Sequence, residues 1–494
     1  MTHNTRDRSH LTVAVDIEMN GLDPNNLVAG AARRVAANIA PGLLAVGPAF
    51  EIVPALASSW EQSRDGTVVT VRLEPGARFH SGRPVLADAV VENFARILAP
   101  DSPSYQKPDY GIVAEVVALD ERTVQFRLHE PFAPFPALLA NSTGMTDVST
   151  IATRDPRTRP VGAGPYEMVH WEPGDRLELR TFSEYHRPGL PRTERVTWRF
   201  VPDGGKRVRE IVAGTVDLAC ALDPLQISAI EAAGQTVAVV DGHGPTHLVF
   251  ACDRPPFSDL RVRRAIAHAI DRPRLLRDLT GGIGVASCSP FAPSSRWYAP
   301  VEPLPYDPEL ARSLLAEAVY GPAELRFTMP VNGPHGARMG AAVAAQLQDI
   351  GIALEVEPHP NPRWWPGIYT SGTWQIALQT WTPMPDPDQV LYRRYHTRGT
   401  FNSGQYRSVE MDRLLDAGRR ELDPRVRQQI YADAQRTIVA DAPAVYLFHE
   451  AAIDAWTPAL HGYQPDPMWV TRIDAATVTP QPAPPLRAGE GAGG

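Results

Sequence analysis

A segment near the start of the chain constrains the fold more than any other part of the sequence. Residues 54–60 and 69–73 carry strand-forming side chains, and the Asp65-Gly66 pair between them is typical of a tight turn. A second glycine turn follows and leads to residues 88–98, where apolar side chains recur three and four positions apart. The segment therefore predicts strands followed by a helix, as in a mixed α/β fold.

The chain of 494 residues is too long for one compact core, so two or three lobes are expected. Strands are expected at 11–16, 123–128, 195–200, 248–251, 374–381 and 444–448, and helices at 88–98, 261–272, 308–319, 337–350, 408–421 and 424–441. Residues 481–494 are rich in Pro, Gly and Ala and have little apolar bulk to offset the entropy of ordering. This tail is expected to be disordered.

Composition excludes several classes of protein. The hydrophobic share of 43% and the net charge of −8 are ordinary for a soluble globular protein and give no electrostatic footprint for nucleic acid. Cys220, Cys252 and Cys288 are widely spaced and form no Cys-x-x-Cys pair, so buried thiols are expected rather than a zinc or redox site. We therefore expect no nucleic-acid partner, no metal and no cofactor.

The sequence leaves the location of the protein open. It holds no run of about 18 apolar residues that could span a membrane. Its first ten residues are polar and do not resemble a signal peptide. If an export signal was removed, the protein is extracytoplasmic, either periplasmic or lipid-anchored at the cell surface; if Met1 is the native start, it is cytoplasmic.

Catalytic motifs fail on their spacing. His449-Glu450 begins like a zinc-protease helix, but the second histidine is replaced by Ile453. His243 and His247 are separated by Gly and Pro, which forbid a shared helix, so solvated loop histidines are expected. Neither a phosphate-binding loop nor a nucleophile elbow occurs. An enzyme is therefore not predicted.

Two features near residue 380 bear on binding. A strand ending at Trp381 leads into a proline-rich loop, and aromatic side chains on such loops often form pocket walls. The acids of Asp386-Pro387-Asp388 are held on a loop, where a turn that caps the next segment is favoured over acid–base chemistry. Three other tryptophans are expected in the core, namely Trp364, Trp365 and Trp374.

Several ordered motifs carry a resemblance that covers about residues 11–475. They are the segment at 54–98 with its Phe79-His80-Ser81-Gly82 turn, and further motifs at 130–135, 162–166, 254–259 and 411–415. In this order they resemble the family 5 solute-binding proteins of bacterial ABC importers, the class that binds peptides and nickel complexes. The resemblance implies an α/β, two-lobed periplasmic-binding-protein-like fold (type II) with an extra inserted domain.

The resemblance also implies how the chain is divided. Lobe I is expected to combine residues 1–45, 160–250 and 450–480. A smaller domain at 46–159 is inserted into it, and lobe II comprises residues 251–449. A ligand held between the lobes binds best when they close on it.

By the same resemblance, some residues are expected to line the ligand. The residues before the Leu-Asp-Pro turn and the tryptophan after the strand are predicted to contact its backbone, with aromatic residues from elsewhere: Glu18, Met19, Asn20, Trp381, Tyr105, Tyr110 and Phe448. Peptide binders of this class commonly have Asp three residues after that tryptophan, and this chain has Met384. Because a buried ammonium needs a countercharge, either Asp386 or Glu18 replaces that Asp, or the ligand is not an ordinary free peptide.

The prediction is therefore a solute-binding receptor of an ABC importer, a monomer that captures a peptide or peptide-like solute and delivers it to permease subunits. Two alternatives stay open at this point. One is a cytoplasmic ligand-binding or sensor protein that keeps the same cleft. The other is an enzyme that recruited the cleft and uses Asp386 or Glu18 for acid–base chemistry.

Overall fold

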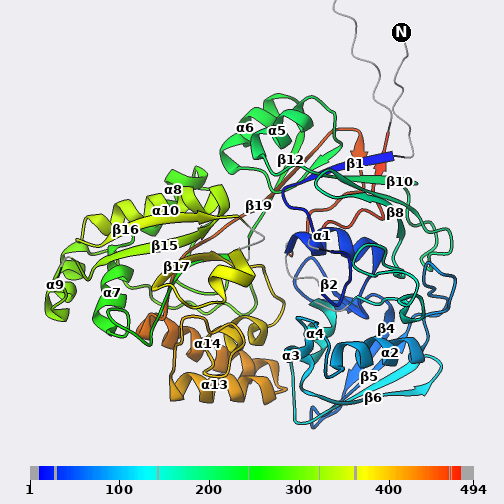
Figure 1. Ribbon diagram of the computed structural model, residues 1–494, viewed down its shortest axis with the longest axis horizontal. Coiled ribbons are helices and arrows are strands. Elements are labelled where there is room, and N and C mark those ends of the chain that lie inside the picture. The colour runs from blue at the N-terminus through cyan, green and yellow to red at the C-terminus, as the bar shows by residue number, and fades with distance from the viewer. Residues whose placement is uncertain are drawn as a thin grey trace, which may run out of the picture.

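The computed structural model shows three groups of helices and strands, each built on its own larger sheet (Figure 1). It describes residues 10–19, 21–26, 30–141, 144–242, 244–321, 323–360, 364–466, 468 and 470–479. The predicted disordered tail and the predicted site residue Asn20 lie outside the described residues.

The first group, which we call lobe I, is built on a seven-stranded sheet. Its strands, in spatial order, are β12 (Thr236–Val240), β19 (Ala452–Trp456), β11 (Leu218–Ala219), β1 (His10–Val15), β10 (Arg195–Phe200), β9 (Arg176–Thr181) and β8 (Tyr166–Glu172). β1 runs parallel to β10 and β11, and its alternating side chains reach two cores, with Val13 in one and Ala14 in the other. The remaining elements of lobe I are α1 (Gly30–Ile39), α5 (Gly204–Val212), η2 (Pro224–Gln226), α6 (Ile227–Ala232), β20 (Leu460–His461) and β21 (Thr477–Val478).

The second group, the inserted domain, contains the segment that most constrained the fold. Its antiparallel sheet has the order β4 (Ala57–Gln62), β5 (Val68–Leu73), β7 (Thr123–Leu128) and β6 (Val113–Asp120). Gly66 in the predicted turn has φ +73°, a conformation that glycine adopts without strain. α2 buries Phe94 against Phe126 of the sheet. The other elements of this domain are β2 (Leu44–Val46), β3 (Ile52–Pro54), α2 (Ala87–Leu98), α3 (Lys107–Tyr110), α4 (Phe135–Asn141) and η1 (Val148–Thr150).

The third group, lobe II, contains a four-stranded sheet and a separate strand pair. The sheet has the order β14 (Val285–Ala286), β18 (Ala444–His449), β13 (Pro245–Phe250) and β17 (Ile376–Thr380), and the parallel pair is β15 (Arg326–Asn332) with β16 (Ala353–His359). Its helices are α7 (Leu260–Ala269), α8 (Arg272–Thr280), α9 (Pro308–Ala318), α10 (Gly333–Gln348), η3 (Trp364–Tyr369), η4 (Asp388–Tyr392), α12 (Arg393–Tyr395), α13 (Val409–Arg420) and α14 (Pro424–Asp441).

The long helices of lobe II begin at side chains that cap them. Ser408 accepts a hydrogen bond from the backbone N–H of Met411 at the start of α13. Asp423 accepts from the N–H groups of Arg425 and Val426 at the start of α14, and Pro424 is the first helical residue. These local signals explain why both helices were predicted from the sequence.

Two chain crossings join lobe I to lobe II, between β12 and β13 and between β18 and β19. β13 pairs with β17 and β18, so the strand expected at the end of lobe I lies in the sheet of lobe II. The division of the chain at the residue numbers given above otherwise stays a prediction.

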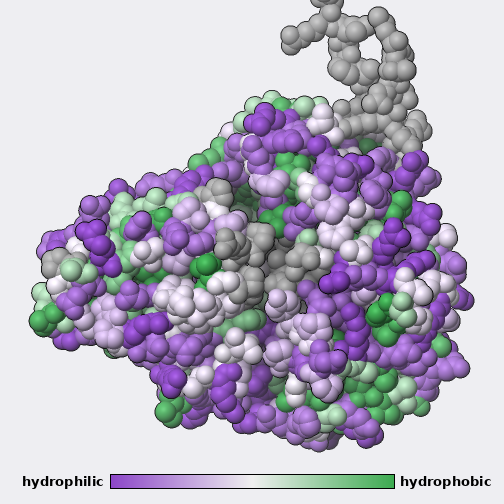
Figure 2. Space-filling model, in the orientation of Figure 1, coloured by the Kyte–Doolittle hydropathy of each residue, from purple (hydrophilic) through white to green (hydrophobic). Residues whose placement is uncertain are grey.

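The length and hydropathy of the described helices bear on whether the chain spans a bilayer. Within the described ranges, no helix is both long and apolar enough to cross a bilayer. Hydrophilic residues predominate over the face shown in Figure 2.

Candidate ligand-binding site

Trp381 follows β17 and is held in place by neighbours from separate segments of lobe II. Its indole Nε1 donates a 2.8 Å hydrogen bond to Nε2 of His247. Its ring meets Tyr369 edge-on at 5.6 Å, and the guanidinium carbon of Arg394 lies 3.3 Å from the ring centre. Only 7% of Trp381 is exposed, so its ring is fixed before any ligand arrives.

His247 corrects the expectation of a solvated loop histidine. β13 begins at Pro245, and all six of its residues are buried, so the imidazole lies inside the lobe. Because an indole N–H only donates, Nε2 of His247 accepts, and Nδ1 carries the proton toward the Pro245 carbonyl at 3.2 Å. Burial lowers the pKa of His247 to about 3, so the ring is neutral. His243 lies outside the described residues.

Tyr446 of β18 extends this cluster across the sheet. Its ring stacks on His247 at 4.8 Å, and its hydroxyl lies 2.6 Å from that of Tyr395. We call this group the Trp381 cluster; its members are Trp381, His247, Tyr446, Tyr369, Tyr395 and Arg394. A cavity of about 10 Å³ is lined by four of them, His247, Tyr369, Tyr395 and Arg394, and has room for roughly one water molecule. A solute must therefore contact the cluster from outside.

Arg394 is a buried cation held by aromatic rings. It is 6% exposed, and its Nη1 donates to the Val390 carbonyl at 2.8 Å. Over the described ranges, no ion pair joins Arg394 to a carboxylate, and its Nε has no hydrogen-bond partner. Burial lowers the pKa of Arg394 to about 10. The face of Trp381 supplies part of the missing compensation by a cation–π contact.

The Asp386-Pro387-Asp388 acids are both buried and both paired. Asp386 accepts two hydrogen bonds of 2.9 Å from the guanidinium of Arg427. Oδ1 of Asp388 lies 3.0 Å from Nε of Arg419, and burial raises the pKa of Asp388 to about 6. The backbone N–H of Asp388 donates to Asp386 at 2.9 Å, as the turn interpretation expects. Asp386 is therefore not a free countercharge for a ligand ammonium.

Glu18 and Met19 belong to lobe I. Oε1 of Glu18 accepts from Nε1 of Trp171 at 3.0 Å and from the backbone N–H of Gly174 at 2.9 Å. Met19 is 5% exposed and packs in the core of lobe I. The carboxylate of Glu18 is thus already hydrogen-bonded to the β8–β9 hairpin. The structure does not bring Met19 to the Trp381 cluster.

The two predicted tyrosines of the inserted domain differ from each other. Tyr105 is 54% exposed. Tyr110 is fully buried, with its hydroxyl donating to the Leu138 carbonyl at 3.3 Å and its ring edge-on to Phe94 at 5.1 Å. The placement of Tyr110 in the ligand site is therefore corrected, because its ring completes the core of the inserted domain.

The predicted place of Phe448 in the ligand site is corrected, because the geometry of β18 turns its side chain into the core. It is 1% exposed and packs in the main core of lobe II with Leu447. The pairing of β18 with β13 shifts register between Thr246 and His247, so Leu447 is an extra residue. The shift puts Phe448 on the opposite face from Tyr446. Tyr446 is therefore the aromatic side chain of β18 that reaches the Trp381 cluster, and no residue pattern in the sequence indicates the bulge.

Met384 and the tryptophans agree with an apolar surrounding. Met384 is half-buried and packs against the core that contains Trp297 and Leu391. Trp364 and Trp374 are buried, as predicted, whereas the side chain of Trp365 lies outside the described residues. Among the side chains that the structure describes, no group of three or more His, Cys, Asp or Glu could hold a metal ion.

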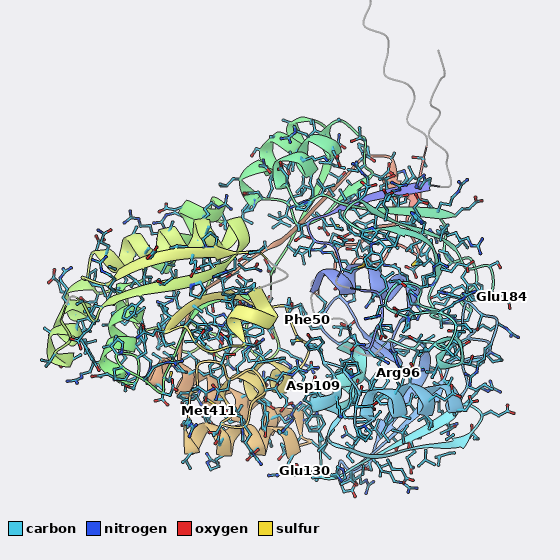
Figure 3. All side chains as sticks on the ribbon, in the orientation of Figure 1. Phe50, Arg96, Asp109, Glu130, Glu184 and Met411 are labelled. Carbon is cyan, nitrogen blue, oxygen red and sulfur yellow. The ribbon has the colours of Figure 1, made fainter. Side chains whose placement is uncertain are left out.

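Lobe II touches the inserted domain at the end away from the chain crossings. Asp109 forms a two-point ion pair with Arg393, one bond being 2.9 Å from Nε to Oδ1, and Glu130 accepts from Arg420 at 2.7 and 3.0 Å. Figure 3 places Asp109 and Glu130 on the side of the inserted domain that faces lobe II. The backbone N–H of Ala133 also donates to the Arg419 carbonyl at 2.8 Å.

At the crossings, Glu450 links the strands of lobe II. Oε1 accepts from Thr246 at 2.7 Å and from Thr380 at 3.2 Å, and Oε2 lies 3.1 Å from Nε2 of His335. Arg338 of α10 forms a 2.8 Å ion pair with Asp223 of lobe I. Lobe II is thus joined to the rest of the molecule at two ends. The backbone N–H of Trp381 donates to the Pro245 carbonyl at 3.2 Å, which ties the Trp381 cluster to the start of β13, next to the first crossing.

Comparison with known proteins identifies this arrangement. Residues 51–402 match the family described as bacterial extracellular solute-binding proteins, family 5 middle. A glutathione-binding protein of Pectobacterium atrosepticum is 27% identical over 491 residues, which covers 94% of each chain. One from Escherichia coli O1:K1 is 27% identical over 476 residues, covering 92% of this chain and 91% of that protein.

Solved structures show the same fold. An ABC transporter-associated periplasmic binding protein of Helicobacter pylori, in complex with a peptide, has a TM-score of 0.86 at 24% identity and covers 95% of this chain and 98% of that one. The oligopeptide-binding protein of Bacillus subtilis, in complex with a nonapeptide, has a TM-score of 0.87 at 20% identity, with 95% and 99% covered. The two-lobed binding-protein fold predicted from the sequence is confirmed.

This fold and the family match define a solute-binding receptor. The chain belongs to family 5 of the bacterial extracellular solute-binding proteins. The predicted receptor role is confirmed at this level, and the family consists of binding proteins rather than enzymes. The family description also supports an extracytoplasmic location over a cytoplasmic one.

Proposed function

We propose that the protein captures a small peptide or peptide-like solute between lobe I and lobe II and delivers it, as a monomer, to the permease of an ABC importer. The observation that carries this proposal is the fixed indole of Trp381 in lobe II. We assign the face of lobe II that carries the Trp381 cluster to the cleft between the lobes and call it the inter-lobe face. Support comes also from the relatives, which are described as binding glutathione, and from fold neighbours solved with peptides.

The charges around Trp381 limit how such a solute is held. Asp386 and Asp388 are neutralised by Arg427 and Arg419, and Met384 stands where peptide binders have an acid. A solute at this face therefore gains most from aromatic contact and backbone hydrogen bonds. An ammonium group of the solute must find its countercharge on another element.

A thermal-shift screen tests the proposal directly. Glutathione, Met-Leu and a set of tripeptides are added to the protein, and a bound solute raises the melting temperature by mass action. Mass spectrometry of the released solute then checks that it is unchanged. If none of these peptides raises the melting temperature, the peptide assignment fails; if the solute is recovered altered, the enzyme alternative replaces the receptor.

Trp381→Ala sharpens the test. We expect affinity for the solute found in the screen to fall by about tenfold or more, because a fixed aromatic side chain at a contact centre carries much of the binding energy. Trp374→Ala is the matched control, since Trp374 stacks on Tyr369 of the Trp381 cluster without belonging to the cluster and is 6% exposed. Both variants should melt earlier, but only Trp381→Ala should bind more weakly. Equal affinities would remove Trp381 from the site.

A further inference from the structure

A second cavity lies between lobe I and the inserted domain. Its volume is about 230 Å³, somewhat below the range of about 300–1,000 Å³ that is typical of small-molecule sites. Its described lining residues come from 24–187 and 468–474, so lobe II contributes none of them. The cavity is therefore separate from the inter-lobe face that the proposed function uses.

Most of the wall is apolar and built from short side chains. Ala37 of α1, Leu44 of β2 and Val53 of β3 contribute to it. Short side chains cannot reach across the space between these elements, which is why it stays open. Such a wall favours an apolar group of a ligand over a charged one.

His186 lines this cavity with two polar atoms that lack partners. Both ring nitrogens are buried from solvent, and no described residue forms a hydrogen bond with either of them. Burial lowers the pKa of His186 to about 4, so the ring is neutral and offers one N–H donor and one acceptor. A buried polar atom without a partner destabilises the fold, so a hydrogen-bonding ligand here recovers free energy.

The other polar groups at this end are mainly donors. The ring of Tyr185 contacts His186 at 4.6 Å, and burial raises the pKa of Tyr185 to about 12, which keeps its phenol protonated. Arg187 and Arg472 line the same cavity, and Arg472 is anchored by a 2.7 Å bond to the Val46 carbonyl of β2. Asp474 is the one acid of the described lining. Arg472 also lies 3.9 Å from Asp466, which is not among the described lining residues. Within the lining itself, two guanidinium groups face one carboxylate, which favours an anionic group.

We infer that this cavity binds a small carboxylate with an apolar body, the carboxylate facing His186, Tyr185 and Arg472 and the body facing α1, β2 and β3. The solute of the inter-lobe face and this ligand then occupy different sites. The inference goes beyond the proposed function and does not depend on it.

Saturation-transfer NMR on the full chain tests this inference, with benzoate and 4-methylpentanoate as probes. Benzamide serves as the uncharged match of benzoate, and we expect it to bind about tenfold more weakly because it cannot pair with the guanidinium groups. Absence of a signal from both carboxylates, or equal binding of benzoate and benzamide, overturns the inference.

Variants locate the site. His186→Ala and His186→Phe should each weaken benzoate by about fivefold or more, and Ala45→Phe, which fills the cavity from β2, should abolish the signal. His170→Ala, on the exposed surface of β8, is the control and should change nothing. Benzoate binding that survives both Ala45→Phe and His186→Phe places the carboxylate elsewhere and rejects the inference.

Trp381→Ala separates this inference from the proposed function. It should leave benzoate binding unchanged, while His186→Ala should leave affinity for the inter-lobe solute unchanged. If benzoate binding instead disappears in Trp381→Ala, the carboxylate occupies the inter-lobe face and the second site is rejected, whatever becomes of the proposed function.

Discussion

Lobe II meets the rest of the molecule at two ends that are built differently. At the crossings, two chain segments pass side by side, and Glu450 ties Thr246 and Thr380 together through hydrogen bonds. At the outer end, two arginines of lobe II pair with Asp109 and Glu130 of the inserted domain, 284 and 290 residues away along the chain. The crossings depend on close packing of backbone, whereas the outer end depends mainly on charge, with one backbone hydrogen bond from Ala133 to Arg419 beside the ion pairs.

This difference assigns the two ends different roles. The crossing segments are covalently continuous, so their contacts persist however the lobes move. The ion pairs of the outer end join surfaces that separate when lobe II swings away, so they favour the arrangement in which the lobes meet. The crossings should therefore control folding stability, and the outer end should control how tightly a solute is held.

The largest effect is expected at Gly242, next to the first crossing. A Cβ atom there would lie 1.0 Å from the carbonyl oxygen of Glu450, so an alanine forces the two crossing segments apart. Gly242→Ala should lower the free energy of unfolding by roughly 2–4 kcal/mol, measured by chemical denaturation. Gly367→Ala is the control, because a Cβ at Gly367 meets nothing within 4 Å. Equal stabilities of the two variants would contradict close packing at the crossings.

The next effect is expected at the buried ion pair of the outer end. Asp109→Asn removes the carboxylate that faces Arg393, in a pair whose side chains are only 16% and 15% exposed. Affinity for the solute should fall by about tenfold, or about 1.4 kcal/mol, while the melting temperature without solute stays near that of the wild type. Isothermal titration measures the affinity, and Asp101→Asn, on the exposed surface of the same domain, is the control. A melting temperature that falls with unchanged affinity would reverse the roles of the two ends.

A smaller effect is expected at the exposed pair. Glu130 and Arg420 are 45% and 52% exposed, and pairs of this kind contribute about 0.2–1 kcal/mol. Glu130→Gln should therefore weaken solute binding by about twofold, and the difference should vanish in high salt. Affinity measured at two salt concentrations checks this, and a loss as large as that of Asp109→Asn would show that exposure does not rank the two pairs.

The smallest effect is expected from the protonation of His335 at the crossings, which changes the folding stability with pH. The negative charge of Glu450 raises the pKa of His335, and Arg338 and Asp223 face the same ring with opposite effects. A raised pKa means that the protonated ring stabilises the fold below about pH 6.5, and that this stability is lost as the pH rises through the pKa of the folded state. Because half of the side chain is exposed, the contribution is about 0.3 kcal/mol.

His335→Gln measures this contribution. The variant should melt slightly earlier than the wild type at about pH 6, and the two should melt together at about pH 9. A gap that widens with pH would contradict the assigned direction.

Elements with strong local signals could be predicted from the sequence. α14 begins and ends at the predicted residues, and Asp423 and Pro424 mark its start. The strands at 123–128 and 195–200 were also predicted with their observed bounds. These signals lie within a few residues of the element that they specify.

The site was harder to predict because its geometry arises from contacts far apart in the chain. Alternation alone would place Tyr446 and Phe448 on the same face of β18, whereas the bulge at Leu447 puts them on opposite faces, so only Tyr446 reaches the Trp381 cluster. Nothing in the sequence distinguishes Arg393, which pairs with Asp109, from Arg394, which is buried under Trp381. The neighbouring Tyr392 and Tyr395 indicate an aromatic environment for this pair, but they do not show which arginine is buried.

The charges at the outer end make the affinity for a solute depend on the ionic strength outside the cytoplasm. A protein outside the cytoplasm meets the salinity of its medium, and dissolved ions screen the exposed Glu130–Arg420 contact far more than the sheltered Asp109–Arg393 contact. The affinity for the solute should therefore fall as the salt concentration of the medium rises. At high salt it should reach a constant value that the less exposed Asp109–Arg393 contact sets.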